Sequence, residues 1–351
     1  MRFLVVILLC YTTTTLVGQD VSTIANPQQT ERDSIRAYYI KKFPDYFFIY
    51  PVIKKRSLNF EIEKDGSENN LLTYKPNNAY SLGLGLYLFE FNFELAFAVP
   101  LDQQSQEIYG KSKARDIQFN LLGKKWGLDL FYQRYNGFYI TESGVSPDAD
   151  TPLPQRSDIV TNNVGLTGHY IVDNSRFSFR SSYNFAERQL YSKGSLLMFG
   201  GLSSFKLNAD SSIITSEQQT KFGANVAFEN LRYTTFSLAP GYTYSMVFKN
   251  FFLNGTLAVG PAHHWILYKT ENSADRNETS VNSFIAARIA MGYNGERIFG
   301  GISFITQGSN VRFEDIRFSN NNGTFKILIG YRLNELGFLR KRVWDLIPFK
   351  I

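Results

Sequence analysis

The sequence has almost no cysteine and, after its first residues, no long apolar run. Cys10 is the only cysteine among the 351 residues, and it lies in the apolar stretch that opens the chain. With that stretch removed, no thiol would remain to form a disulfide or bind a metal. No later stretch reaches the ~20 consecutive apolar residues of a membrane-spanning helix. A disulfide scaffold and a helical membrane protein are therefore excluded.

Charge is also sparse and evenly distributed. Charged residues make up 19% of the chain, and 37 Lys and Arg against 31 Asp and Glu give a formal net charge of +6. The one basic cluster is Arg340-Lys341-Arg342, near the end of the chain. A nucleic-acid-binding protein would concentrate its basic residues on one face or stripe. We therefore expect no nucleic-acid partner.

The first residues have the features of a secretory signal peptide. Arg2 supplies a positive charge ahead of the apolar run that ends at Cys10, and Gly18 is a small residue suited to cleavage. The run before the cysteine is too short, and lacks the small residue that a lipidation signal would carry, so we do not expect a lipoprotein. We predict a signal peptide over 1–18 and a periplasmic N-terminal segment over 19–45.

A short helix is the expected structure at the end of that segment. The stretch from Glu31 to Phe43 favours a helix, with Asp33 or Ser34 as its N-cap and Pro44 ending it.

Beyond this point the sequence alternates with a period of two, which indicates β-strands. Aromatic residues make up 16% of the chain, and in the clearest case Phe177, Phe179, Tyr183 and Phe185 alternate with small or charged residues. Aromatic residues favour strands over helices. The main segments with this pattern are 80–88, 91–99, 116–121, 126–133, 163–172, 176–185, 235–248, 251–268, 285–293, 298–313 and 324–333, and 222–228 offers a further one.

These strands are better suited to a membrane barrel than to a soluble sandwich. Many exceed the ~5–6 residues of an average globular strand and reach the ~9–11 needed to cross a bilayer. Tight turns alternate with longer polar loops at Leu101–Ala114 and Ile140–Asp158, as in outer-membrane barrels. We predict an all-β fold: one antiparallel transmembrane β-barrel of 12–14 strands over 46–335. The tail, 336–351, is expected to be an interfacial segment or a last strand.

The polar face of these strands would then line the lumen, where both signs of charge are present. The expected lumen residues are Glu61, Glu90, Glu94, Asp116, Asp129, His169, Arg176, Arg180, Arg288, Lys326 and Arg332. Mixed charge favours salt bridges across the lumen. Such an interior could form a closed plug or a narrow water-lined path, and we favour the plug because a barrel of this size leaves little room.

No motif identifies catalytic chemistry or a cofactor. His263 and His264 are adjacent, so on a strand they point to opposite faces and cannot bind one metal together. His169 is expected to be a hydrogen-bonding residue of the lumen. There is no phosphate-binding loop and no Cys/His metal spacing. We therefore expect no metal and no cofactor, and an enzymatic role is the less favoured hypothesis.

Several short motifs resemble a known family. They are Phe43-Pro44-Asp45, Tyr74-Lys75-Pro76-Asn77, the Tyr80–Leu86 strand, Arg188-Gln189, Gly194-Ser195, Asp210-Ser211-Ser212, Pro240-Gly241-Tyr242 and Gly260-Pro261. The family is the set of outer-membrane barrels of Bacteroidetes-like bacteria catalogued as domain of unknown function 4421. The resemblance covers about residues 40–335. It implies an outer-membrane barrel, and it carries over no catalytic or binding residue.

Three hypotheses for function remain open. The first is a non-enzymatic outer-membrane barrel, either a narrow pore or a structural protein of the Gram-negative envelope. The second is an enzyme that modifies lipid or lipopolysaccharide, and the third is ligand binding or adhesion through the external loops. In each case the expected partners are outer-membrane lipid, lipopolysaccharide and the barrel assembly machinery.

Overall fold

The structure is a computed structural model, and several of the segments discussed above lie outside the part that it describes. The signal peptide over 1–18, the tail over 336–351 and Glu90 are among them. The described residues are 27–64, 71–88, 91–143, 151–214, 216–222, 227–270 and 276–335.

Strands dominate the described chain. They are β1 (Ile40–Lys42), β2 (Tyr46–Lys64), β3 (Leu71–Lys75), β4 (Ser81–Leu88), β5 (Phe91–Ala98), β6 (Lys113–Leu122), β7 (Trp126–Glu142), β8 (Gln155–Ile171), β9 (Glu187–Gln189), β10 (Lys193–Asn208), β11 (Phe228–Phe248), β12 (Phe251–Thr270), β13 (Arg276–Asn294), β14 (Ile298–Phe313) and β15 (Ile316–Asn334). The helices are α1 (Pro27–Tyr39), α2 (Gln103–Tyr109), α3 (Arg180–Tyr183) and α4 (Ser216–Phe222). None of the described helices has the length and apolar character to span a membrane.

The main sheet closes on itself as an antiparallel β-barrel, which confirms the predicted fold class. Its strands follow the order β15-β14-β13-β12-β11-β10-β8-β7-β3-β2, and β15 pairs with β2 to complete the ring. This ring has 10 strands, whereas the whole described sheet has 13 because β4, β5 and β6 attach to it. The predicted range of 12–14 strands therefore matches the sheet but exceeds the closed ring. The sequence pattern identifies strands but not which of them close the ring.

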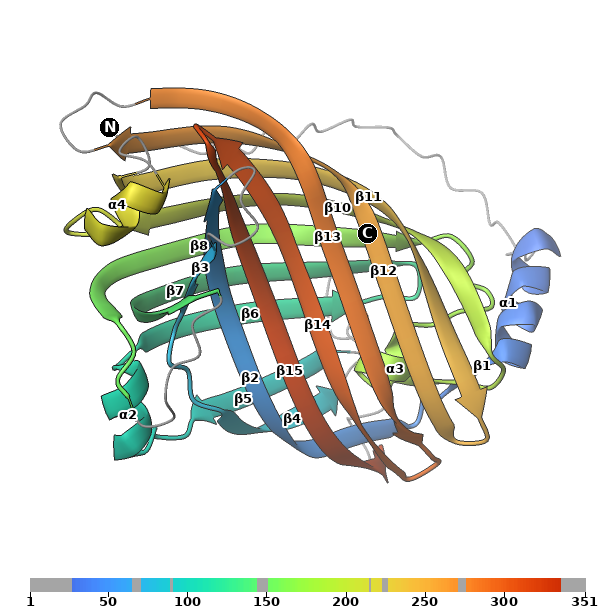
Figure 1. The fold of residues 1–351 in the computed structure, drawn as a ribbon. Helices are drawn as coiled ribbons and strands as arrows, with labels where there is room; N and C mark the ends of the chain where they lie inside the picture. Colours follow the sequence, from blue (N-terminus) through green and yellow to red (C-terminus); the bar gives the residue numbers. More distant parts are fainter. Residues whose placement is uncertain are drawn as a thin grey trace, which may run out of the picture.

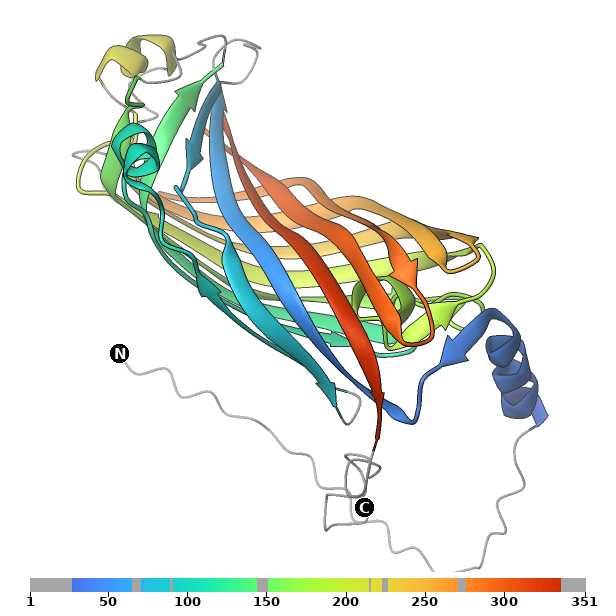
Figure 2. The ribbon, with the colours of Figure 1, turned by 90° about the horizontal axis from the view of Figure 1, so that it is seen from below.

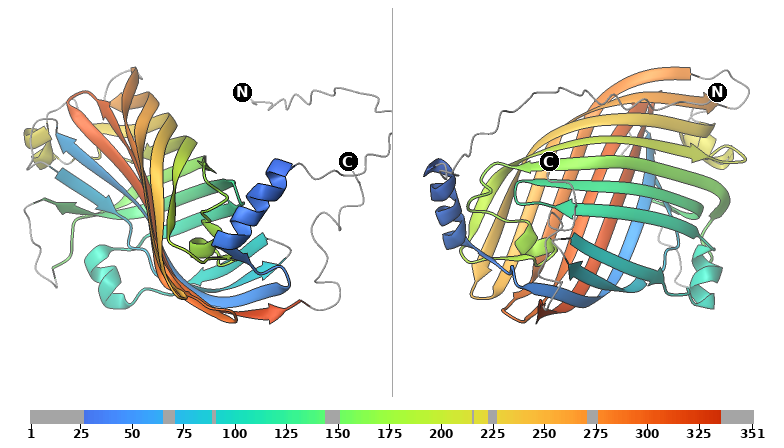
Figure 3. Two further views of the ribbon diagram at one scale, coloured as in Figure 1. Left: turned by 90° about the vertical axis from the view of Figure 1, so that its right-hand side faces the viewer. Right: turned by 180° about the vertical axis from the view of Figure 1, so that it is seen from behind.

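The barrel is elongated, and its two ends differ (Figures 1 and 2). Helix α1 lies at one end, named here the α1 end, and helices α2 and α4 lie at the other, named the α2 end. Figure 3 shows the short β1–β9 sheet and α3 beside the α1 end.

The outward face of the strands is apolar, as the alternation predicts. On β2, Ile49 and Ile53 are exposed while Tyr50 and Val52 between them are buried. In water such a continuous exposed apolar surface would be unfavourable, whereas a β-barrel in a bilayer presents this face to lipid. The inward face differs from the prediction, because aromatic residues fill it near both ends of the barrel.

The segment 176–185, predicted as the clearest strand, is not a strand. A tight turn leads into it, in which the Phe177 N–H donates to the Asp173 carbonyl. The chain then folds into the lumen and forms the single helical turn α3. Phe177, Phe179 and Phe185 are each no more than 2% exposed. The residues at 177–185 are all buried, including the polar ones between the aromatic residues, so the alternation of residue types here does not mark the two faces of a strand.

Two other predicted boundaries are wrong. Helix α1 runs from Pro27 to Tyr39, so Asp33 and Ser34 lie inside it rather than at its N-cap. It ends before Phe43 because Ile40–Lys42 pairs with β9 as strand β1. The further strand expected over 222–228 is not present as predicted, since Phe222 ends α4 and Phe228 begins β11. The residues at 223–226 lie outside the described chain.

If the outward face contacts lipid, a charge there should be costly in proportion to its depth. Leu257 is 56% exposed near the middle of β12, and Phe251 is 59% exposed at its first residue. We expect Leu257→Arg to lower the free energy of unfolding by about 2–4 kcal/mol and the control Phe251→Arg by about 0–1 kcal/mol. Urea unfolding in lipid vesicles measures both. Equal losses at the two positions would contradict a transmembrane β12.

Candidate functional site

Two buried apolar clusters divide the lumen into three zones. The cluster at the α1 end includes Phe48, Phe177, Phe185, Phe199 and Phe299. The cluster at the α2 end includes Phe60, Tyr74, Phe205, Tyr233 and Phe318. Between them lies a cavity of about 520 Å³, lined by charged and apolar side chains and named here the chamber. The charged side chains predicted for the lumen gather mainly in this middle zone.

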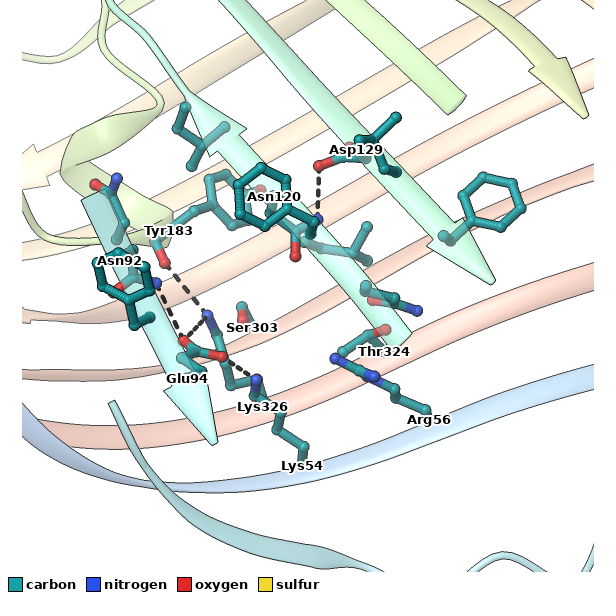
Figure 4. Close-up of a pocket in the computed structure, with 18 of the residues that line it drawn as sticks. Lys54, Arg56, Asn92, Glu94, Asn120, Asp129, Tyr183, Ser303, Thr324 and Lys326 are labelled. Atoms are coloured by element: carbon teal, nitrogen blue, oxygen red, sulfur yellow. Dashed lines mark hydrogen bonds and ion pairs between the residues drawn. The ribbon is translucent and has the colours of Figure 1, made fainter. Parts of the chain in front are cut away.

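The first charged group of the chamber centres on Glu94 of β5 (Figure 4). Its carboxylate contacts Nζ of Lys54 from β2 and lies 3.2 Å from Nζ of Lys326 from β15. The Tyr50 hydroxyl also donates a hydrogen bond to it at 2.8 Å. All three charged side chains are less than one-fifth exposed. Two lysines therefore share one carboxylate. Through them Glu94 joins the β4–β5 hairpin to β2 and to β15.

The second group spans the lumen. Arg288 of β13 donates to Oδ2 of Asp129 on β7 at 2.7 Å, although these strands are five places apart in the ring of 10. The guanidinium carbon of Arg288 also lies 5.2 Å from the ring centroid of Phe199. Asn120 donates to the other carboxylate oxygen of Asp129 at 2.7 Å. The two opposite walls are thus in direct contact here.

The third group joins β2 to β6. Arg56 donates to Oδ1 of Asp116 at 3.1 Å and to its backbone carbonyl at 2.8 Å. The other carboxylate oxygen of Asp116 accepts from Gln133 and from Tyr135, at 2.9 and 2.8 Å. The structure therefore brings Glu94, Asp116 and Asp129, with Lys326 and Arg288, into one middle zone.

The other predicted lumen residues lie elsewhere. Arg180 and Arg332 are buried at the α1 end, where Arg332 donates to the Phe185 carbonyl at 2.7 Å and Arg180 to the Tyr87 hydroxyl at 2.6 Å. Arg176 is 44% exposed in a turn, 3.7 Å from Asp173.

Glu61 also departs from the prediction. On β2 the buried positions Phe60 and Ile62 flank it, so Glu61 shares the outward face with Ile53. The reason is the register of β2, whose inward face carries the even-numbered residues.

The histidines form no catalytic arrangement among the described residues. His169 is buried between Phe179 and Phe199, and neither of its ring nitrogens has a hydrogen-bond partner there. Nδ1 of His264 lies 2.8 Å from the Thr235 hydroxyl. His263 packs edge-on against Trp265. No described group of three or more potential metal ligands exists.

The closure of the α1 end depends on a residue that sequence reasoning missed, Glu187. Its buried carboxylate lies 2.6 Å from a guanidinium nitrogen of Arg36 on α1 and 3.6 Å from one of Arg180. Burial favours the neutral acid, but the Arg180 and Arg36 guanidiniums outweigh it and hold the pKa of Glu187 below its ordinary value. The carboxyl also accepts from the Ser178 hydroxyl. Glu187 therefore links α1 to the segment over 172–192, named here the inner loop.

The closure of the α2 end uses the Asp210-Ser211-Ser212 motif. Arg156 of β8 donates to the carbonyls of Ser211 and Ser212, at 3.1 and 2.8 Å. The backbone N–H of Asp210 donates to Asp158 at 3.2 Å. The Arg188-Gln189 motif has the matching role at the α1 end, where Oε1 of Gln189 accepts from the Ser178 N–H. Both motifs therefore hold inward-folded connections rather than reactive groups.

Removing the charge of Glu94 should leave two buried lysines without a counterion. Breaking a buried ion pair by removing one partner costs about 3–5 kcal/mol, so we expect Glu94→Gln to lower the free energy of unfolding by that amount. Adding Lys54→Met removes one uncompensated charge. The double variant should therefore recover part of the loss in the same urea unfolding assay. A double variant less stable than Glu94→Gln would show that the lysine contributes mainly by other contacts.

The low pKa of Glu187 predicts an acid-sensitive inner loop. Because the carboxylate is stabilised in the folded state, its contribution is present above the ordinary pKa of 4.5 and is lost as the pH falls through the lower folded value. We expect proteolysis within the inner loop to accelerate below about pH 4. Glu187→Gln should be cleaved faster at pH 7 and show a weaker acid dependence. An unchanged pH profile in this variant would assign the acid effect to other groups.

Comparison with solved structures finds barrels of similar extent but low similarity. The outer membrane protease OmpT from Escherichia coli has 10% identity and a TM-score of 0.40, with 84% of this chain and 98% of that chain covered. The translocator domain of the autotransporter NalP from Neisseria meningitidis has 8% identity and a TM-score of 0.32, with 87% of this chain and 95% of that chain covered. The attachment invasion locus protein Ail of Yersinia pestis has 9% identity and a TM-score of 0.23, with 82% of this chain and 99% of that chain covered. At these scores the matches carry no argument about function.

No curated protein matches the chain. The model of one family does match, over residues 31–333, which is most of the sequence. This confirms the resemblance noted from the short motifs. The chain belongs to the family described as Domain of unknown function (DUF4421).

Proposed function

We propose that this protein is a non-enzymatic outer-membrane β-barrel that does not conduct ions and serves the envelope as a sealed barrel. Its exposed apolar belt and closed antiparallel ring support insertion into a membrane, and the signal peptide expected over 1–18 supports export. On this proposal α1 lies in the periplasm, and lipid and lipopolysaccharide surround the barrel. The barrel assembly machinery would insert it.

The observation that carries the proposal is contact between opposite walls at the α2 end. Phe205 on β10 and Phe318 on β15 are five places apart in the ring of 10, yet their ring centroids are 5.6 Å apart. Phe318 is also 6.0 Å from Tyr233 on β11. All three side chains are at most 2% exposed. A water-filled path through this layer would require these rings to separate.

The inner loop supplies a second barrier at the α1 end. Phe185 stacks on Phe299 of β14, with ring centroids 4.9 Å apart, and contacts Phe252 of β12. Asn294 donates to the carbonyls of Ser181 and Glu187, at 2.9 and 3.0 Å. These hydrogen bonds satisfy backbone groups that would otherwise be buried without partners. The packing of the inner loop therefore supports a plugged lumen rather than a narrow pore.

Planar bilayer recording tests this proposal. We expect the reconstituted full-length protein to give no discrete conductance steps at moderate voltage, under conditions in which a general porin gives them. Folding is checked on the same sample by the altered gel migration of an unboiled barrel. Discrete steps from folded protein would overturn the proposal and favour the narrow pore.

A further inference from the structure

The barrel wall has an unpaired seam between β5 and β6. Among the described pairings, β5 joins only β4 and β6 joins only β7. Strand β3 closes the ring by pairing with both β2 and β7, but only near the α2 end. In hydrocarbon each unpaired backbone group costs several kcal/mol, and such an edge is tolerated only where it lines a polar cavity. Side chains from both sides of this seam line the chamber, among them Glu94 of β5 and Asn120 of β6 (Figure 4).

The chamber extends through the wall at the seam. Its lining includes the inward-facing Glu94 and Lys326 together with Leu95 and Phe119, which are 66% and 45% exposed on the outer surface. Glu94 and Leu95 are consecutive residues of β5 and point to opposite faces. A cavity bounded by both therefore connects the polar lumen with the apolar outer face.

A second hollow, of about 560 Å³, continues from the seam along the outer face. It shares Phe119, Leu130 and Phe131 with the chamber. Its remaining lining is mostly apolar and lies across β6, β7, β8, β10 and β11, including Ile117, Tyr132, Val164, Leu166 and Leu202. The charged chamber and the apolar surface groove therefore adjoin at these three side chains.

Specific contacts hold the seam at its α2 end. Arg56 of β2 reaches Asp116 of β6 through the two hydrogen bonds described above. Asn77, just after β3, donates to the carbonyls of Ser105 and Gly110, at 3.0 and 2.8 Å, in the connection between β5 and β6. Asn77 is 8% exposed. The divergence of the two hairpins is therefore built into the fold.

The charge of the chamber favours an anion. Among the described residues, the four cationic side chains of its lining, Lys54, Arg56, Arg288 and Lys326, pair with three carboxylates, those of Glu94, Asp116 and Asp129. Nζ of Lys326 lies in the lining of the chamber, 3.2 Å from Oε1 of Glu94 and 3.5 Å from the carbonyl oxygen of Tyr183. Its ammonium is a suitable partner for an added carboxylate or phosphate.

We propose that the seam is a binding site for an anionic amphiphile with one acyl chain, which enters from the membrane between β5 and β6. The head group binds in the chamber at Lys326, and the chain lies against Phe119 in the outer hollow. A volume of about 520 Å³ lies in the range of ~300–1,000 Å³ typical of small-ligand sites. A fatty acid and a lysophosphatidic acid share the required chemistry. The inference rests on the proposed membrane location.

Tryptophan quenching in lipid nanodiscs tests the site. In the full-length protein Trp126, Trp265 and Trp344 are replaced by Phe, and a single reporter is introduced as Phe119→Trp in the outer hollow. The matched control reporter is Phe236→Trp, on the outward face of β11, where Phe236 is 53% exposed. A brominated C18 fatty acid should quench the seam reporter saturably, at a mole fraction at least tenfold lower than for the control.

The specificity for the head group is tested by changing first the brominated probe and then a charged side chain of the protein. Brominated lysophosphatidic acid should reproduce the tight quenching if phosphate is accepted, and quenching by the fatty acid alone would assign the site to carboxylates. A brominated fatty alcohol should quench both reporters alike. Lys326→Met removes the proposed partner of the head group and leaves Glu94 paired with Lys54. This variant should weaken quenching by the fatty acid at the seam reporter at least tenfold.

The outcomes separate this inference from the proposed function. If brominated phospholipid fails to quench the control reporter, the membrane location itself is wrong. If it quenches the control normally while fatty acid quenches both reporters at equal mole fractions, the barrel is in the membrane but the seam binds no amphiphile. Tight seam quenching by the alcohol would also overturn the anionic specificity.

Discussion

The requirement that backbone amides in a membrane find partners governs the rest of this structure. A sheet with two free edges would leave rows of N–H and C=O groups in hydrocarbon. The pairing of β15 with β2 closes the ring, and among the described strands β5 and β6 keep an unpaired edge at the seam. This ladder runs from Asn334↔Tyr46 to Ile316↔Lys64, nearly the full length of both strands. Once the ring is closed, alternate side chains must point to lipid or to the lumen. The apolar belt and the polar chamber are both consequences of this closure.

The same requirement shapes the interior. A ring of 10 strands is narrow enough for long side chains to bridge opposite walls. Arg288 and Asp129 do so with charge, and Phe205 and Phe318 do so with aromatic rings. Buried charges need partners, which explains why ion pairs occupy the chamber. The inner loop closes one end, where Asn294 satisfies backbone carbonyls, and the described segment 209–214 closes the other, where Arg156 does the same.

Much of the barrel could be predicted from the sequence, because period-two alternation is a local property. The segments that became β11 and β12, for example, show it plainly in Phe236, Leu238 and Leu253. The path of the inner loop could not be predicted, since Phe177 and Phe179 alternate as a strand would. Glu187 could not be identified either, because its partner Arg36 is distant in sequence and lies in the N-terminal helix. The seam was also hidden, since strands adjacent in sequence usually pair.

We infer that a closed ring of backbone hydrogen bonds encloses the barrel and that, among the described strands, β5 and β6 are left unpaired with each other at the seam. Amide hydrogen exchange of the full-length protein in lipid nanodiscs tests it most directly. We expect slow exchange for the amides of β2 and β15 along their shared ladder, and faster exchange for the amides of β5 and β6 that face each other. Rapid exchange along the β2–β15 ladder, or equal protection at the seam, would contradict it.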